Sequence, residues 1–205
     1  MLQLDLSSSK IKKGGFKLAA FGTSTTCLFK STDATEICAK RTYIVVERVI
    51  SDSRSNGSLV TKSIDVPHDS RKQFQNLSME IACAVWARAL LNLVYDFIDK
   101  ERKRVGRIPF NIPRFRFVEL ALAMEHDSAA VGGRQNLNSV FLIEEVITED
   151  QQGPFRKYLN NVSPTPLIMS SEEDNERAKF LSFSQHVQYL KTMKQAFVSD
   201  YQGKQ

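Results

Sequence analysis

Residues 36–50 read EICAKRTYIVVERVI and are dense in β-branched and aromatic side chains. That composition predicts a β-strand. Residues 25–29 form a second β-rich segment before it, whereas residues 51–69 after it are rich in Ser, Asn, Gly and Asp and predict a loop. The first part of the chain is therefore predicted to build a sheet.

A long helix is predicted to follow this loop. Asp69 or Ser70 can cap its first turn, and apolar residues recur with helical spacing to Ile98 or beyond. Positive charge suits the C-terminal end of a helix. The predicted end carries such a basic cluster: Lys100, Arg102, Lys103 and Arg104.

The rest of the chain predicts further strands and one more helix. Residues 116–124 and 139–147 have strand-like composition, residues 172–190 predict a helix, and residues 195–200 predict a final strand. Strands, helices and strands follow one another without regular βαβ alternation, which predicts an α+β fold.

Composition excludes several classes of protein. The 205 residues include 42% hydrophobic and 25% charged residues, which is typical of a globular chain and argues against long disorder or a fibrous repeat. No run of 18 apolar residues occurs and the N-terminus does not resemble a signal peptide, so no membrane association is expected. Three irregularly spaced cysteines indicate reduced thiols, which favours the cytoplasm.

The net charge of +5 is unevenly distributed. Residues 1–110 hold 18 Lys and Arg against 11 Asp and Glu, whereas residues 111–205 hold 10 against 12. A basic N-terminal part favours a polyanionic partner such as nucleotide phosphate, nucleic acid or an acidic protein. A solvated basic face is the simpler alternative.

A glycine-rich stretch lies near the N-terminus. Residues 12–22 read KKGGFKLAAFG, and Gly14 and Gly15 allow backbone N–H groups to approach phosphate oxygens without obstruction by a Cβ atom. The spacing matches neither a Walker A motif nor GxGxxG, so a plain turn is the alternative.

Lys40 lies within the predicted strand 36–50. A strand lysine that binds nucleotide phosphates is the arrangement found in kinases, and Glu80 on the predicted helix is a candidate ionic partner. The alternative is an edge lysine that points into water.

Asp200 and Gln202 close the last predicted strand. Oxygen ligands at i and i+2 lie on the same side of an extended chain, and Mg²⁺ prefers oxygen donors together with phosphate. Without further context, the favoured interpretation is a strand-end Asp and Gln in water.

Six motifs follow one another along the chain. They are GGFKLAAFG at 14–22, CAKRTY at 38–43, FLIEEVI at 141–147, GPFRKYLNN at 153–161, HVQY at 186–189 and QAFVSDYQG at 195–203. In order and spacing they resemble the alpha-type, or atypical, protein kinases, the family of myosin heavy chain kinase and elongation-factor kinase.

The resemblance implies a two-lobed, kinase-like α+β fold over residues 1–205. The N-lobe would cover about 10–140, the hinge about 142–147 and a partial C-lobe about 148–205. It implies an ATP- and Mg²⁺-dependent transfer of phosphate to Ser or Thr of a protein whose identity the sequence does not give.

The resemblance also implies roles for individual residues. Lys17 takes the place of a family arginine in the glycine loop. Lys40 and Asp200 are expected to be catalytic, and Asp200 with Gln202 to bind the metal ion. The expected nucleotide-binding residues are Gly14, Gly15, Lys17, Lys40, Glu144, Glu145 and Val146.

One departure from the family pattern affects the expected activity. The family carries a second aspartate in a T-D-P-Q-like segment and then a zinc module of His and Cys, and neither occurs before Gln205. A truncated C-lobe without zinc ligands is therefore expected. Two alternatives stay open: a pseudokinase that binds nucleotide or protein, and a basic nucleic-acid-binding domain that uses the 100–116 cluster. Aromatic residues are not regularly interleaved with that cluster, which argues against nucleic-acid binding.

Overall fold

The computed structural model describes residues 3–6, 11–51, 59–108, 111–126, 137–147 and 154–204, without the side chains of residues 50, 51 and 60. The chain divides into two compact units. Unit 1 comprises Met1–Ala82 and Val118–Val146, and unit 2 comprises Cys83–Phe117 and Ile147–Gln205. The predicted boundaries of lobes and hinge remain predictions.

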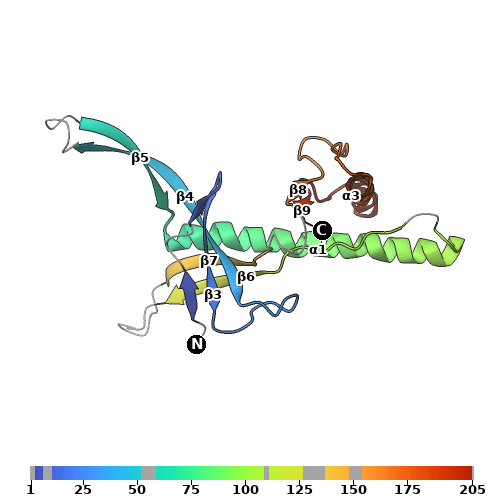
Figure 1. Cartoon of the computed structure of the whole chain (residues 1–205), viewed down its shortest axis with the longest axis horizontal. Helices are drawn as coiled ribbons and strands as arrows, with labels where there is room; N and C mark the ends of the chain where they lie inside the picture. The colour runs from blue at the N-terminus through green and yellow to red at the C-terminus, as the bar shows by residue number, and fades with distance from the viewer. Residues whose placement is uncertain are drawn as a thin grey trace. The chain divides into compact units, whose positions relative to one another are not determined.

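Unit 1 is built around an antiparallel sheet (Figure 1). The order of its central path is β1-β3-β4-β7-β6, with β2 paired to β3 and β5 paired to β4. The strands are β1 (Leu4–Leu6), β2 (Lys12–Lys13), β3 (Lys17–Ser24), β4 (Glu36–Ser51), β5 (Leu59–Pro67), β6 (Leu120–His126) and β7 (Leu137–Glu145).

The strand predicted at 36–50 is confirmed as β4, and it has two different sets of neighbours. Its first part pairs with β3 and β7, and its second part pairs with β5 alone. The loop predicted for 51–69 is therefore wrong over Leu59–Pro67, where pairing to β4 overrides the polar composition. The strand predicted at 25–29 is also wrong, because the ladder of β3 ends at Ser24.

The long helix is confirmed as α1 (Ser70–Val105). Asp69 caps it, since its Oδ1 accepts a hydrogen bond from the amide of Lys72 at 2.9 Å. The helix ends at Val105: the amide of Gly106 still donates to Arg102 O at 2.9 Å, and the φ of +83° at Gly106 then turns the chain out of the helix.

One 18-residue window of α1, with a mean hydropathy of 1.5, is apolar enough to cross a membrane by length and composition alone. The sequence expectation concerned unbroken apolar runs, which is a stricter criterion. Only 28% of that window is buried, and length and composition alone do not distinguish a membrane span from the core helix of a folded protein.

Unit 2 contains the second part of α1, the helix α3 (Glu172–Lys191) and two short paired strands, β8 (Arg156–Lys157) and β9 (Gln202–Gly203). The helix predicted at 172–190 is thus confirmed. The strand predicted at 195–200 is wrong: the chain after α3 turns through Met193 and Lys194, which both have positive φ. Apolar residues of α1 and α3 pack with Tyr158 and Tyr201 into one core.

Two apolar clusters lie on opposite faces of the unit 1 sheet. Phe29, Ile37, Ala39 and Ile143 form one. Leu77 of α1 packs with Val140 and Leu142 of β7 in the other. The predicted strands 116–124 and 139–147 are confirmed as β6 and β7 with shifted ends, and the α+β class is confirmed.

Candidate functional site

Strand register brings Lys17 and Lys40 onto one face of the unit 1 sheet. Ala19 of β3 lies opposite Lys40 of β4, and Lys17 lies opposite Thr42. Residues directly opposite in an antiparallel pair share a face, and so do residues two apart on a strand. The two lysines are therefore diagonal neighbours on the sheet.

Lys40 is held by an ion pair with Glu144. Leu142 of β7 lies opposite Lys40, so Glu144, two residues further along β7, projects from the same face. Lys40 Nζ donates to Glu144 Oε2, and the side chains are 27% and 15% exposed. The alternative of a lysine pointing into water is thereby ruled out within unit 1. Cys38, two residues before Lys40, is buried, and this burial raises the pKa of its thiol.

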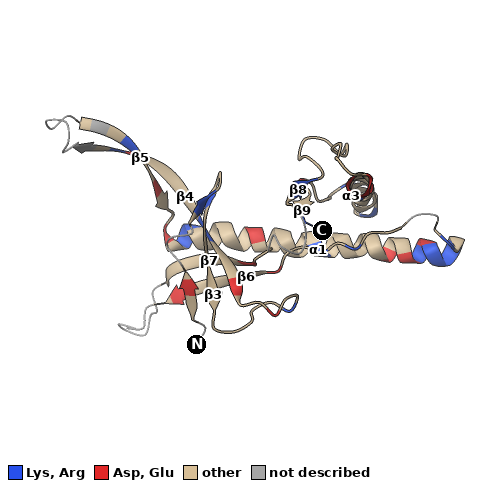
Figure 2. Cartoon of the chain, in the orientation of Figure 1, with Lys and Arg blue, Asp and Glu red and all other residues tan. Residues whose placement is uncertain are grey.

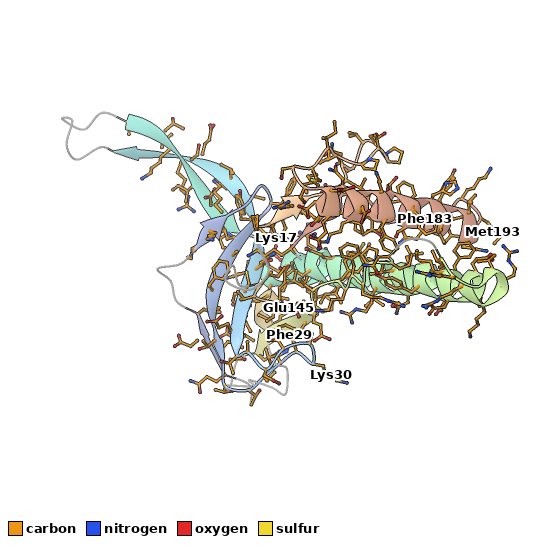
Figure 3. All side chains as sticks on the ribbon, turned by 45° about the vertical axis from the view of Figure 1, so that its right-hand side comes forward. Lys17, Phe29, Lys30, Glu145, Phe183 and Met193 are labelled. Carbon is orange, nitrogen blue, oxygen red and sulfur yellow. The ribbon has the colours of Figure 1, made fainter. Side chains whose placement is uncertain are left out.

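Glu80 has a different partner from the expected one. Its carboxylate on α1 accepts from Nζ of Lys17, whereas Lys40 takes Glu144. The predicted Lys40–Glu80 pair is therefore wrong, because sequence spacing does not show which lysine of a sheet face a helix glutamate will reach. Figure 3 labels Lys17 on β3.

The glycine turn is closed by its own backbone. The amide of Gly14 donates to Lys17 O at 2.9 Å, and the Tyr43 hydroxyl donates to Gly14 O at 2.8 Å. A Cβ on Gly15 would meet nothing within 4 Å, so the structure gives no steric requirement for glycine there. These contacts agree with the plain-turn alternative, and phosphate binding by Gly14 and Gly15 stays a prediction.

The predicted hinge residues fall at the end of β7. Glu144 lies between Cys38 of β4 and Leu120 of β6, so its backbone faces a neighbouring strand on both sides. The amide of Glu145 donates to Glu119 O at 3.3 Å. The first residue past the strand is Val146, whose backbone makes no hydrogen bond to any other described residue.

Glu144 and Glu145 lie on opposite faces of β7. The carboxylate of Glu145 accepts from the Ser31 hydroxyl, on the side where Phe29 is buried. Glu145 and Phe29 are labelled near one another in Figure 3. Of the two glutamates, only Glu144 lies on the face of Lys40.

Asp200 and Gln202 lie in unit 2, on either side of a buried tyrosine. Tyr201 is 6% exposed, its carbonyl accepts from the Tyr158 amide at 2.8 Å, and Gln188 donates to its hydroxyl at 3.1 Å. Burial raises the pKa of Tyr201 to about 12. Because Tyr201 is fixed in the core, the positions of Asp200 and Gln202 are set by the buried residue between them.

Asp200 does not have the extended backbone that the sequence argument assumed. Its φ is +59°, and only Gln202–Gly203 is strand. The side chain is turned toward Lys157 of β8, whose Nζ lies 2.6 Å from Asp200 Oδ1. The i, i+2 rule therefore does not apply to Asp200, and the position of its carboxylate follows from tertiary contacts.

Asp200 and Gln202 offer a carboxylate oxygen and an amide oxygen, which are donor types that Mg²⁺ accepts, and metal binding by this pair stays a prediction. Mg²⁺ is commonly held by one or two protein oxygens together with phosphates. Asp200 Oδ1 is buried and, despite the nearby lysine, has no hydrogen bond of good geometry to any described residue. Among these residues, no group of three or more His, Cys, Asp or Glu side chains could hold a metal ion by itself.

A cluster that the sequence did not reveal secures β8. Asp174 of α3 is 1% exposed and pairs with Arg156 and with Arg177, the latter at 2.9 Å. The side chain of Ser171 caps α3 by accepting from the Asp174 amide at 3.1 Å. An S-x-x-D pattern signals such a cap, but the approach of Arg156 from a distant strand leaves no sequence signal.

Basic residues in the last turn of α1 and in the segment after it line a pocket in unit 2. The pocket has a volume of about 300 Å³. Its lining includes the basic Arg102, Arg107 and Arg114 and the apolar Ile98 and Ile108. Arg114 also stacks on Tyr95, with the guanidinium 4.6 Å from the ring centre. Figure 2 shows basic residues gathered at the C-terminal end of α1. Neither Asp200 nor Gln202 lines this pocket.

The predicted site residues thus fall into two groups. Unit 1 holds Gly14, Gly15, Lys17, Lys40 and Glu144–Val146, and unit 2 holds Asp200 and Gln202. Within unit 1, the structure brings Lys40 to Glu144 and Lys17 to Glu80.

Comparison with known proteins supplies a family. The model of the alpha-kinase family matches residues 31–205. That range includes Lys40, Glu144–Val146, Asp200 and Gln202, and it begins after the glycine turn. No curated protein matches the chain.

Proposed function

The chain belongs to the alpha-kinase family, and from this premise we propose that it binds Mg²⁺-ATP and transfers the terminal phosphate to Ser or Thr residues of a protein. Family membership supports a kinase-like transferase function. Nucleotide and metal binding, residue specificity and the individual roles below are the proposal.

The ion pair between Lys40 and Glu144 carries the proposal. A lysine ammonium has three donors, so the bond to Glu144 leaves two for phosphate oxygens. Phosphoryl transfer depends mainly on positioning and charge stabilisation, and a lysine fixed on a central strand supplies both. The carboxylate of Glu144 prevents the side chain from rotating away from the face of the sheet.

Lys17 has a supporting role in the proposal. It lies diagonally from Lys40 on the same face, and its bond to Glu80 connects β3 to α1. As a lysine it contributes a point charge, without the planar, bidentate grip of an arginine. It would therefore add to phosphate affinity without fixing phosphate orientation.

Asp200 and Gln202 would hold the metal ion, which when bound neutralises charge on the phosphates. The buried Oδ1 of Asp200 supports this assignment, because a buried carboxylate oxygen without a good hydrogen bond has unused acceptor capacity. Lys157 at 2.6 Å balances the charge of Asp200 until the ion binds.

Val146 would contact the adenine ring through its backbone. The edges of Glu144 face β4 and β6, and the amide of Glu145 is bonded to Glu119. The backbone just past β7 is therefore the part of the predicted hinge with free hydrogen-bonding groups, and within the described residues Val146 provides the first of them.

The proposal is tested by substituting Lys40 and titrating the chain with a fluorescent ATP analogue in the presence of Mg²⁺. Lys40→Ala removes the phosphate-binding charge and leaves Glu144 without its cation, so nucleotide affinity should fall by about tenfold or more. Lys30→Ala, which removes an exposed lysine of unit 1, is the matched control. If Lys40→Ala binds the ATP analogue as tightly as the parent chain, the nucleotide does not bind at this face of the sheet.

A further inference from the structure

The second part of β4 and the whole of β5 form a two-stranded ribbon, residues 43–51 and 59–67, beyond the central sheet of unit 1 (Figure 1). All 9 residues of β5 pair with β4. In the described chain no strand pairs with the other edge of β5. Two-stranded ribbons are only marginally stable in water, and an unpaired edge offers backbone groups to another strand.

One face of this ribbon is aliphatic with a pair of positive charges. Ile44 lies opposite Val66, and Val46 lies opposite Ile64. The next pair along this face is Arg48 opposite Lys62, and both side chains are exposed. Ile44 is 47% exposed although it is aliphatic.

Among the described residues, Arg48 and Lys62 have no acidic partner. Like charges directly opposite on paired strands destabilise a sheet. Neither Arg48 nor Lys62 forms an ion pair with any residue in the described ranges. The acids of the ribbon, Glu47 and Asp65, alternate with these residues and project from the other face, where Asp65 is already bonded to Lys13 at 2.7 Å.

These charges determine which strand the free edge would accept. A lysine on an edge strand disfavours pairing with neutral apolar or basic segments. A strand that places a carboxylate beside Lys62 would offset the repulsion from Arg48, and an aliphatic side chain beside Ile64 would cover apolar surface. Charge complementarity therefore selects an acidic strand with aliphatic residues.

We propose that the free edge of β5 binds an extended acidic segment of a partner protein by strand addition. The segment places an acidic residue beside Lys62 and, two positions away on the same face, an aliphatic residue beside Ile64. Backbone hydrogen bonds to β5 provide affinity, and the pair of side chains provides specificity. This interaction is separate from the proposed nucleotide site and requires no nucleotide.

The probe is a capped, labelled peptide of about eight residues that repeats Glu-Thr-Val-Thr, so that Glu and Val lie two positions apart on one face of the strand; this length covers most of β5. The reference peptide has Lys in place of each Glu. Fluorescence anisotropy is measured with the full chain and without nucleotide, so the result is independent of ATP binding. The Glu peptide should bind more tightly than the Lys peptide, and added salt should reduce the difference.

Charge reversal provides the specific test. Lys62→Glu should weaken binding of the Glu peptide by about tenfold and strengthen binding of the Lys peptide. The ribbon should remain folded, because the new carboxylate faces Arg48. Lys103→Glu makes the same charge change at an exposed position of α1 and should leave both affinities unchanged.

Three results would overturn the proposal. They are no binding of the Glu peptide, equal binding of the two peptides by the parent chain, or the same affinities in Lys62→Glu as in the parent. A neutral variant, Lys62→Gln, guards against misfolding, since it should give intermediate affinities for both peptides.

Discussion

At Thr42, the side-chain amide of Gln73 makes the two backbone hydrogen bonds that a neighbouring strand would otherwise make. Gln73 is fully buried, its Oε1 accepts from the Thr42 amide at 2.9 Å, and its Nε2 donates to Thr42 O at 2.6 Å. Thr42 is two residues from Lys40, where β4 leaves β7 and continues into the ribbon. One glutamine of α1 thus fixes the strand that carries the proposed phosphate-binding lysine.

Gln73→Leu should destabilise the chain by about 1–3 kcal/mol, because the Thr42 amide loses its acceptor in a buried position. The loss is limited because the His68 amide still donates to Thr42 O at 3.1 Å. Urea unfolding measures the change. Gln75→Leu on the exposed side of α1 is the control, and equal effects of the two substitutions would contradict this role of Gln73.

Tyr201 makes stability depend on alkaline pH. Burial raises its pKa from 10.0 in the unfolded chain to about 12 in the folded one. Between these values the folded state binds more protons than the unfolded state, so stability falls as the pH rises through this range and is fully present below it. A shift of that size corresponds to about 2–3 kcal/mol.

The measurement is the free energy of unfolding against pH for the parent chain and for Tyr201→Phe. The variant loses the hydrogen bond from Gln188 and should be less stable at neutral pH. It should also show a smaller decline above pH 10, where Tyr95, whose pKa burial also raises, still contributes. Parallel curves would show that Tyr201 does not titrate in this way.

At the scale of elements, the approach of β1 to β3 depends on a glycine. A Cβ on Gly22 would lie 1.9 Å from Asp5 O, which no side chain can tolerate. β1 contributes Leu4 and Leu6 to the apolar cluster around Phe29, so displacement of β1 opens that cluster.

Gly22→Ala should therefore cost about 2–3 kcal/mol or release β1 from the sheet. Hydrogen exchange of the β1 and β3 amides, together with urea unfolding, measures both outcomes. Gly15→Ala is the matched control, because nothing lies within 4 Å of the added atom and it should have little effect. If the two substitutions are equally mild, the close approach of β1 is not required.

Sequence patterns predicted most of the elements but not all. The strand β4 and the helices α1 and α3 follow from local composition, periodicity and capping. β5 was missed because the centre of its sequence, LVTKSIDVP, holds three consecutive polar residues and so breaks the alternation typical of a strand, and because the strand is stabilised by its long partner β4. The composition of segment 195–200 predicts a strand, yet Gln185 Nε2 donates to Val198 O and the Val198 amide donates to Gln188 Oε1, and these two bonds hold the segment in an irregular path.

For the molecule as a whole, the proposed metal ligands of unit 2 are tested by their effect on nucleotide binding. Asp200→Ala should abolish the dependence of nucleotide binding on Mg²⁺, because it removes one of two proposed metal ligands. The measurement is ATP-analogue affinity with and without Mg²⁺. Asp96→Ala, an exposed acid on α1, is the control and should retain the metal dependence. Metal-independent binding in the parent chain would refute the assigned pair.

Incubation with radiolabelled Mg²⁺-ATP and a protein substrate then separates a kinase from a nucleotide-binding module. Phosphoserine or phosphothreonine in the substrate supports transfer. Nucleotide binding without transfer identifies the pseudokinase, and salt-sensitive binding of an oligonucleotide in place of ATP identifies the nucleic-acid alternative.

The α+β class, the principal strand and helices, and the ordered motifs by which the chain resembles alpha-kinases could all be predicted from the residues. These features depend on local propensity, periodicity and spacing, which are properties of the chain alone. Four contacts could not be predicted and are known from the folded chain: Lys40 pairs with Glu144, Lys17 pairs with Glu80, Asp200 turns toward Lys157, and β5 extends β4 into a ribbon. The three ion pairs join residues distant in sequence, and strand register and helix packing select each partner from several residues of suitable charge. The ribbon joins consecutive strands, but β5 depends on pairing with β4 rather than on its own composition.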